Sequence, residues 1–380
     1  MNPHRKIHIA QPTLGDEEWE ALKEPISTGW LTQGPKVAAF ETRFAELHEV
    51  EHALATTSCT TALHLALVAL GIGPGDDVLV PAFTWVASAN AVEYTGARAV
   101  FVDVRRDTYN LDPEQIAAKL SDRTKAIMAV HLFGLCADIE AIKAAAPGIP
   151  IIEDAACAAG ARYRGTSAGA LGEMGCFSFH PRKTITTGEG GMLTTNDDGL
   201  AERCTKLRNH GAEISEEQRH HGPRPYILPD FNLMGFNYRM TDLQGAVGCV
   251  QIERLQELVT ERRKRARSYS EQFEDLDWFI PPNVPEGYDH SWQAYVGYVD
   301  EDKAPAERNA IMEQLQEKGI GTRPGTHAVH QLGYYRDRYQ LQSDDFPAAR
   351  DCEAKTIAIP LHNRMTDDDY AYVVETMKNL

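Results

Sequence analysis

Short apolar runs, rich in β-branched and aromatic residues, alternate with helix-patterned stretches through the first 200 residues. Runs of this kind are typical of buried strands, and they cover residues 53–56, 78–80, 99–102, 126–131, 150–153, 176–179 and 192–195. Their alternation with helices predicts a mostly parallel sheet covered on both faces. Ligands of such sheets bind beyond the carboxyl ends of the strands. The residues that follow each run are therefore the first candidates for a functional site.

A lysine lies just beyond one of these strands, in the stretch CFSFHPRKTITTGEGGMLTTN. Lys183 belongs to the polar connection between the last two runs. One interpretation is a solvated loop lysine, which is the usual environment of this residue. The other is an amine whose pKa is lowered by its surroundings and which forms a Schiff base with a carbonyl. Lys183 alone does not decide between them.

An acidic residue provides the second part of the pattern. Asp154 directly follows the buried run 150–153. Pyridoxal phosphate chemistry needs a Schiff-base lysine together with an acid at the pyridine nitrogen, which keeps the ring an electron sink. Lys183 and Asp154 are residues of the two types required.

Small hydroxyl residues connect the first strand to the helix that follows it. Thr60 and Thr61 lie in the segment Thr57-Ser58-Cys59-Thr60-Thr61. Ordinary helix capping explains such residues. The alternative is a phosphate site, because free backbone N–H groups and the helix dipole favour an anion and hydroxyl groups add donors.

At these residues the sequence resembles the DegT/DnrJ/EryC1/StrS family of sugar aminotransferases. The matching pieces cover most of the first 250 residues in the family's order, and they are TTSCTTALHLALVALGIGPGDDV, PAFTWVASANAV, IIEDAAC, CFSFHPRKTITTGEGGMLTTND, LRNHG and GFNYRMTDLQGAVG. The resemblance implies the α/β fold type I of pyridoxal phosphate enzymes. We expect a large domain over residues 1–250 with a mostly parallel sheet of the seven-stranded type. A smaller α+β domain follows over residues 251–380, and the N-terminal segment packs on it.

The resemblance also implies roles around the cofactor. Lys183 and Asp154 are the catalytic residues, and the further cofactor contacts are Thr60, Thr61, Trp85, Cys157, Ser178, Asn237 and Arg239. Trp85 would stack on the pyridine ring, although a core tryptophan is the common alternative. Ser178 would reach the phosphate, although a strand serine bonded to backbone is equally ordinary.

Two of these contacts are expected to come from a second subunit. The resemblance implies that Asn237 and Arg239 reach across a two-fold dimer interface to the neighbour's cofactor phosphate. The alternative is a simple turn before the helix that the capping box Thr241–Gln244 opens. Under the first interpretation, the protein is a homodimer with shared active sites.

Cys157 departs from the family's pattern. The family usually has Gln or His here, and that side chain contacts the hydroxyl of the cofactor ring. A thiol is a weak donor, so we expect this contact to be lost or replaced by water.

Candidate substrate contacts lie in two places. His180 is either a structural histidine or a group near the reacting carbon. The segment GTRPGTHAVH, residues 321–330, closes over the sugar in the family, and its candidates together with one nearby tyrosine are Arg323, His327, His330 and Tyr335. The alternative is a polar loop between domains.

Overall composition narrows the class of protein. The 380 residues carry a net charge of −17, which argues against a nucleic-acid-binding protein. No membrane-spanning run or secretory signal is evident, and the seven cysteines form no CxxC pair, so we expect a cytoplasmic protein with reduced thiols.

Residues 212–230 are polar and are interpreted as a mobile loop that can reach a neighbouring subunit. The pair His220–His221 within them is weak evidence for a metal, and none is expected.

The sequence therefore predicts an aminotransferase that uses pyridoxal 5'-phosphate. It would move an amino group from glutamate to a nucleotide-linked keto sugar, for amino-sugar and surface polysaccharide biosynthesis. One alternative is a deoxysugar dehydratase on the same scaffold, but such relatives carry His where this chain has Lys183. Another is a non-catalytic regulator, in which a degraded site would be expected.

Overall fold

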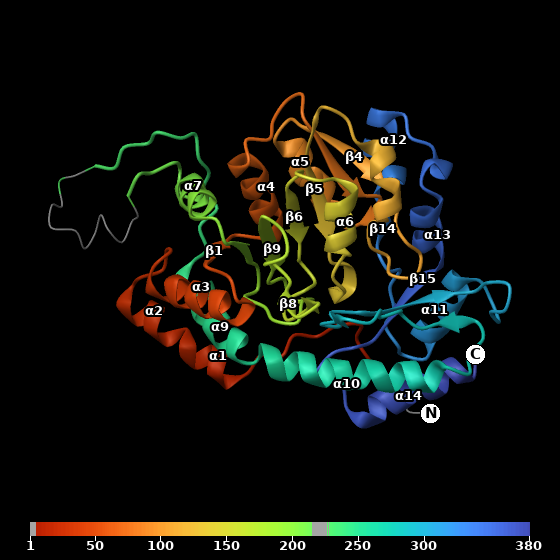
Figure 1. Ribbon diagram of the computed structural model, residues 1–380. Coiled ribbons are helices and arrows are strands. Elements are labelled where there is room, and N and C mark those ends of the chain that lie inside the picture. Colours follow the sequence, from red (N-terminus) through yellow and green to blue (C-terminus); the bar gives the residue numbers. More distant parts are fainter. Residues whose placement is uncertain (1–4, 215–225, 227) are drawn as a thin grey trace.

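The computed structural model describes residues 5–214, 226 and 228–380, and a seven-stranded sheet lies at its centre (Figure 1). The strand order is β1-β10-β9-β6-β5-β2-β4, and only β10 runs antiparallel to its neighbours. The strands are β1 (His52–Thr56), β2 (Asp77–Pro81), β4 (Arg98–Val102), β5 (Thr124–Val130), β6 (Ile151–Asp154), β9 (Met174–Ser178) and β10 (Gly191–Thr195). The predicted mostly parallel sheet is therefore confirmed.

Helices cover both faces of the sheet because its strands are apolar on both sides. In β2, Val78 and Val80 pack in a cluster with α4 and α5, whereas Leu79 packs in a second cluster with α3 and α6. All three are fully buried. The continuous apolar runs of the sequence follow from this two-sided burial. The helices named here are α3 (Pro35–His48), α4 (Cys59–Ala69), α5 (Ala87–Tyr94) and α6 (Ile139–Ala145).

Capping residues define where several helices begin. Thr241 caps α9 (Asp242–Glu253) through the predicted capping box with Gln244, and Thr366 caps α14 (Asp367–Lys378). The side-chain oxygen of each accepts a backbone N–H that would otherwise lack a partner. The other α-helices of the described residues are α1 (Asp16–Ala21), α2 (Lys23–Thr28), α7 (Asp198–Arg208), α10 (Leu255–Phe273), α11 (Arg308–Glu317), α12 (Gly333–Tyr339) and α13 (Pro347–Lys355).

A second, smaller sheet lies in the C-terminal third of the chain. Its strands, in the order β11-β13-β15, are β11 (Phe279–Ile280), β13 (Tyr295–Val299) and β15 (Thr356–Ile359). Helices α10, α11 and α14 contribute to its separate core, and α10 runs along the molecule in Figure 1. Ile7 of the N-terminal segment joins this core and donates its N–H to the carbonyl of Gly319 at 2.8 Å. The proposed domain boundary at residue 250 stays a prediction.

Short strands form two further groups. The first joins a segment that follows β2 of the large sheet to a segment in the C-terminal third of the chain. β3 (Phe83–Thr84) pairs with β14 (His327–Ala328). A further small sheet contains β7 (Arg162–Tyr163), β8 (Thr166–Ser167) and β12 (Tyr288–Asp289).

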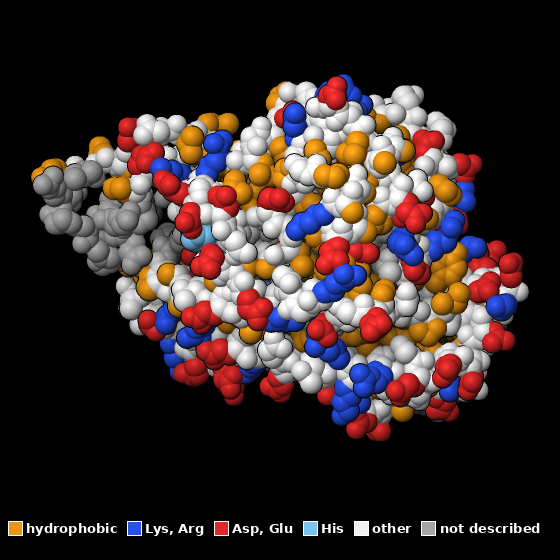
Figure 2. All heavy atoms as spheres, viewed as in Figure 1, with side chains coloured by type: hydrophobic (Ala, Val, Ile, Leu, Met, Phe, Trp, Pro, Cys, Tyr) orange, Lys and Arg blue, Asp and Glu red, His pale blue; other side chains and the backbone are white. Residues whose placement is uncertain are grey.

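The surface and the helices also bear on the class of protein. In the described part of the face shown in Figure 2, Lys and Arg side chains are interspersed with Asp and Glu and form no continuous basic area. Within residues 5–214, 226 and 228–380, no helix combines the length and apolar character that crossing a bilayer requires.

Candidate active site

Strands β1, β9 and β6, with β10 between β1 and β9, bring the candidate segments to one edge of the sheet. Thr56 at the end of β1 is paired with Gly191, and Gly191 is paired with Ser178 at the end of β9. Asp154, at the end of β6, is paired with Cys176 on the other side of β9. The segments that follow β1, β6 and β9 therefore meet at this edge, as expected for the carboxyl ends of strands.

Asp154 is held in a buried position at this edge. Its side chain is only 5% exposed. Ser88 Oγ donates to Asp154 Oδ2 at 2.7 Å, and the backbone N–H of Ala156 donates to Oδ1 at 3.2 Å. The thiol of Cys59 lies 3.8 Å from Oδ1. These bonds fix the plane of the carboxylate in the site.

Lys183 lies in the turn after β9, which is closed by a bond from its N–H to the carbonyl of His180 at 2.8 Å. Its amine nitrogen Nζ donates to Cys157 Sγ at 3.1 Å. Burial acts to lower the pKa of this amine, but the neighbouring Cys157, Cys59 and Asp154 outweigh it, and the pKa of Lys183 is raised. The lowered pKa assumed for this amine is therefore not found in the chain without cofactor, and the Schiff-base role of Lys183 stays a prediction.

The start of α4 forms a possible anion site beside this group. Ser58 is the N-cap, and its Oγ accepts the N–H of Thr61 at 3.2 Å. Thr61 Oγ1 in turn accepts the N–H of Ser58 at 3.0 Å, so its hydroxyl belongs to the capping box. Thr60 makes no side-chain hydrogen bond within the described residues, so its hydroxyl is available to a ligand.

A glycine lets the start of α4 approach β10 closely. A Cβ atom on Gly191 would lie 2.4 Å from the backbone carbon of Ser58 and 2.6 Å from the backbone nitrogen of Cys59. Any larger residue would push this segment away from β10. The close packing therefore keeps the start of α4 next to Ser178.

Trp85 and His327 lie together near the same edge. Trp85 follows β3 and is 60% exposed, so it is not a core tryptophan. The centroid of its ring lies 5.5 Å from that of His327. The pairing of β3 with β14 produces this contact, and it joins a candidate cofactor contact to a candidate substrate contact.

His180 and Ser178 precede Lys183 and are half-buried. Ser178 Oγ accepts the N–H of His180 at 3.4 Å, which is a weak bond. His180 Nδ1 accepts the N–H of Arg182 at 3.2 Å, and burial is the main cause that lowers the pKa of this imidazole. Burial therefore favours the neutral imidazole, and the bond to Nδ1 places its proton on Nε2.

The other three substrate candidates lie in different environments. Arg323 is exposed and donates to the carbonyl of Thr322. His330 and Tyr335 are buried in the core formed with α12 and α13, and the Tyr335 hydroxyl donates to Asn90 Oδ1 at 2.6 Å. Burial at 0% and 1% exposure does not support a direct contact of His330 or Tyr335 with a substrate.

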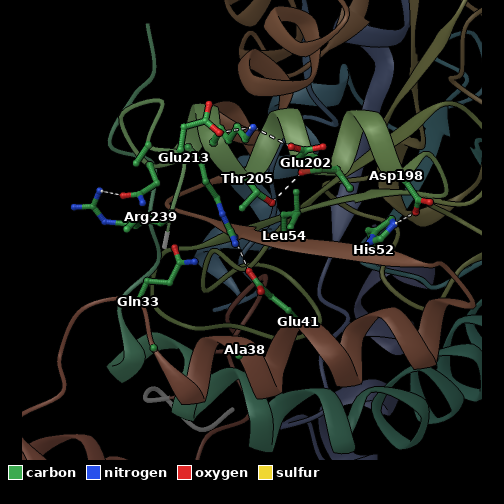
Figure 3. Close-up of a pocket in the computed structure, with 17 residues that line it drawn as sticks. Gln33, Ala38, Glu41, His52, Leu54, Asp198, Glu202, Thr205, Glu213 and Arg239 are labelled. Carbon is green, nitrogen blue, oxygen red and sulfur yellow. Dashed lines mark hydrogen bonds and ion pairs between the residues drawn. The ribbon is translucent and has the colours of Figure 1, made fainter. Parts of the chain in front are cut away.

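The segment that was expected to reach a second subunit lies near the start of α4 in its own chain. Thr57 donates its N–H to the carbonyl of Tyr238 at 3.0 Å. Arg239 donates to Asn209 Oδ1 at 2.7 Å and lines a cavity of about 620 Å³ between α3, β1 and α7 (Figure 3). Asn237 is exposed and has no side-chain hydrogen bond among the described residues. Neither side chain is bonded to Lys183 or Asp154 in one chain.

The pair His220–His221 lies outside the described residues. Across the described ranges, no three His, Cys, Asp or Glu side chains gather as a metal site would require.

Two residues next to Asp154 were not found from the sequence. Ser88 and Cys59 both contact its carboxylate. Ser88 had a detectable signal, because it stands four residues after Thr84 at the start of a helix that follows a strand. That spacing places both hydroxyl groups on one side of the turn.

These residues fit pyridoxal phosphate. Lys183 would supply the amine for a Schiff base, Asp154 would supply the acid for the ring nitrogen, and Trp85 would supply an exposed aromatic face. The free hydroxyl of Thr60 and the start of α4 suit the phosphate. Amine, acid and anion site come from segments that share one edge of the sheet.

Comparison with known proteins agrees with this arrangement. Residues 12–378 match the DegT/DnrJ/EryC1/StrS aminotransferase family. The chain is 37% identical over 372 residues to the spore coat polysaccharide biosynthesis protein SpsC of Bacillus subtilis, covering 97% of this chain and 95% of SpsC.

Solved structures give the same result. The aminotransferase TlmJ of Streptoalloteichus hindustanus is 33% identical with a TM-score of 0.89, covering 98% of both chains. The protein Spr1654 of Streptococcus pneumoniae, solved in its PLP form, is 26% identical with a TM-score of 0.90, also covering 98% of both chains. The chain therefore belongs to the DegT/DnrJ/EryC1/StrS aminotransferase family and is a pyridoxal phosphate-dependent aminotransferase.

Proposed function

We propose that this aminotransferase moves an amino group from glutamate to the ketone of a nucleotide-linked deoxysugar, in the biosynthesis of a polysaccharide or glycan. The family resemblance and the name of SpsC support a sugar as the acceptor. The exposed Trp85–His327 pair supports an acceptor that enters between β3 and the loop of residues 321–330.

One observation carries the proposed chemistry. Asp154 ends β6, Lys183 lies in the turn after the neighbouring strand β9, and the charge of Asp154 acts on the Lys183 amine. When bound, pyridoxal phosphate supplies the electron sink that stabilises a carbanion at the α-carbon of an amino acid. Lys183 Nζ takes the proton from that carbon and later returns one when the ketone is aminated. Asp154 keeps the ring nitrogen protonated, and the start of α4 with Thr60 binds the phosphate.

The order of events follows from having one amine-transfer site. The amino donor binds first and leaves as its keto acid, and the sugar ketone then takes the amino group at the same place. Kinetics should therefore be ping-pong.

A homodimer with shared sites belongs to the same proposal. The exposed Asn237 side chain is free to contact a second chain. Near it, the described residues of the segment after α7 project away from the sheet (Figure 1). They expose large apolar side chains, with Leu228 84% and Met234 83% exposed, and such exposure in a group is typical of an interaction surface.

The test is to convert the enzyme to its amino form with glutamate alone and then add candidate acceptors. A panel of nucleotide-linked 4-keto and 3-keto sugars should include one that restores the original absorption spectrum. The Lys183→Ala variant is the control, because it should show neither change. No spectral change with glutamate would overturn the donor, and recovery only with simple keto acids would overturn the sugar acceptor.

A further inference from the structure

Two hydroxyl groups form a hydrogen-bonded chain that ends on the Asp154 carboxylate. Ser88 Oγ lies 2.7 Å from Asp154 Oδ2, and Thr84 Oγ1 lies 2.9 Å from Ser88 Oγ. Thr84 and Ser88 are 1% and 0% exposed. Water therefore cannot replace either hydroxyl without a change in packing.

The chemistry of the groups fixes the direction of this chain. An ionised carboxylate only accepts hydrogen bonds, and a serine hydroxyl has one proton. Ser88 also lies 3.2 Å from the carbonyl of Trp85, but the carboxylate is nearer and charged, and it is the stronger acceptor. Ser88 therefore donates to Asp154 and accepts the proton of Thr84. Each bond polarises the next, which strengthens the bond to the carboxylate.

Backbone hydrogen bonds hold both hydroxyl groups in place. Thr84 is paired with His327 through β3 and β14, and the preceding Ala82 donates its N–H to the carbonyl of Val102 at 2.8 Å. Ser88 lies in the first turn of α5, and its N–H donates to the carbonyl of Trp85 at 3.1 Å. The backbones of Thr84 and Ser88 are therefore fixed independently of Asp154, and the Ser88 donor does not follow the carboxylate if it turns.

We propose that Ser88, supported by Thr84, is a positioning residue that holds the ionised Asp154 carboxylate in the orientation needed at the cofactor's ring nitrogen. Ser88 does not contact the reacting atoms, and its effect passes through Asp154. The inference rests on the proposed role of Asp154. It extends that role to two residues on a different strand and helix.

The test compares Ser88→Ala, Ser88→Thr and Thr84→Val with the wild-type holoenzyme, each with and without Asp154→Asn. Ser88→Ala should slow amino transfer from glutamate about ten-fold, the loss expected for one hydrogen bond to a charged group. Ser88→Thr keeps the hydroxyl and should restore the rate. Thr84→Val has nearly the same shape and should give a smaller loss, so it tests the chain even if Ser88→Ala folds poorly. In the Asp154→Asn background, Ser88→Ala should add no further loss.

A second readout needs no amino donor. NMR of a nitrogen-15-labelled cofactor ring reports whether the ring nitrogen is protonated. In Ser88→Ala this resonance should shift toward the unprotonated position at a lower pH than in the wild type, which a role in packing alone would not cause.

The possible failures can be told apart. A normal rate and resonance in Asp154→Asn would remove the proposed role of Asp154 itself. A slow Asp154→Asn enzyme beside a Ser88→Ala enzyme with wild-type rate and resonance would overturn only the role of Ser88. Losses that multiply in the double variant would also overturn it, because Ser88 would then act independently of Asp154.

Discussion

The amine nitrogen of Lys183 donates a hydrogen bond to the thiol sulfur of Cys157, 3.1 Å away. The backbone of Cys157 is itself fixed, because Ser291 Oγ donates to its carbonyl at 3.1 Å. The amine of the lysine is therefore held at the edge of the sheet by a thiol, which is a weak hydrogen-bond acceptor. The contact holds Nζ beside Cys157, three residues after Asp154, and the charge of Asp154 acts on this amine.

Changing Lys183 to Ala should abolish turnover and still allow cofactor to bind without a covalent bond. The amine forms the Schiff base and moves the proton, whereas the phosphate contacts remain. Borohydride reduction of the wild type followed by peptide mass spectrometry should find the cofactor on Lys183. Lys206→Ala is a suitable control, because that amine is ion-paired on α7. An adduct on any other lysine would contradict the assignment.

Changing Asp154 to Asn should preserve the fold and cofactor binding but slow the half-reaction with glutamate on the order of a hundred-fold. The amide cannot keep the ring nitrogen protonated. Stopped-flow absorbance measures this rate directly.

The neighbouring carboxylate gives a matched control. Glu153 is buried beside Asp154 but pairs with His131 at 2.7 Å and accepts three backbone N–H groups. Glu153→Gln should lower stability and leave the half-reaction of the folded enzyme near the wild-type rate. If Asp154→Asn behaved in the same way, Asp154 would be structural.

Thr60 and Thr61 should respond differently to replacement by Val. The Thr61 hydroxyl caps α4, so Thr61→Val should lower the free energy of unfolding by about 1 kcal/mol. The Thr60 hydroxyl is free in the described structure, so Thr60→Val should leave stability unchanged and weaken cofactor binding about ten-fold. Thermal unfolding without cofactor and titration with pyridoxal phosphate separate the two effects. Unchanged affinity in Thr60→Val would leave only capping as the role of this segment.

Shared sites should be visible in mixed dimers. One chain carries Lys183→Ala and the other carries Asn237→Ala with Arg239→Ala, so one site collects both defects and the other has none. An isolated mixed dimer should have roughly half the wild-type activity, whereas each parent dimer is impaired.

The control for this experiment removes the contact that Arg239 makes in its own chain. Asn209→Ala breaks that bond and should leave activity close to the wild type. If mixed dimers show no recovery, each site is built within one chain.

Stability should fall on acidification because His48 is buried without charge. Burial is the main cause that lowers the pKa of His48 to about 4, from 6.5 in the unfolded chain. Between these values the unfolded state binds the proton and the folded state does not, so the free energy of unfolding falls as pH falls from 6.5 to 4. At 1.36 kcal/mol per pKa unit the loss is about 3 kcal/mol.

Denaturant titrations of the wild type and His48→Gln at several pH values measure this loss. The variant should lose less stability over the same pH range. His52→Gln is the control, because the His52 ring lies partly exposed beside Asp198. Equal slopes for the wild type and His48→Gln would contradict the prediction.

The sheet was predictable because its strands are buried on both faces. Runs 99–102 and 192–195 differ by one residue at one end from Arg98–Val102 and Gly191–Thr195, and run 150–153 is shifted by one residue from Ile151–Asp154. Such continuous apolar runs leave little freedom in where a strand lies.

Irregular segments were harder to predict. The sequence pattern over residues 304–318 is typical of a helix, yet α11 begins only at Arg308, because the N–H groups of Lys303 and Ala304 bond to the carbonyl of Asp300 in a turn that precedes Pro305. Asp112 followed by Pro113 is a sequence pattern typical of a helix start, yet the structure has only a short 3₁₀ helix there, Pro113–Gln115.

The site was predictable only in part, because only some of its residues lie at or just after the ends of strands. Lys183 and Asp154 follow strands, so the sheet determines where they meet. Ser88 meets Asp154 across 66 residues of sequence, and no local pattern indicates that contact. His330 and Tyr335 belong to a polar stretch, yet the packing of α12 and α13 buries them, and sequence alone does not show which side of an irregular segment faces inward.

The position of β10 between β1 and β9 has a consequence for the size of the cofactor that fits. The segment proposed to bind the phosphate follows Thr56, the segment that carries the amine follows Ser178, and Gly191 is the register partner of both residues. Two strand spacings of about 4.8 Å each separate the ends, roughly 10 Å in all. This length is set by backbone bonds rather than by side chains, so side-chain substitutions that preserve the sheet leave it unchanged. Changes in substrate preference are then free to accumulate around Trp85 and residues 321–330 without disturbing the reach from phosphate to amine.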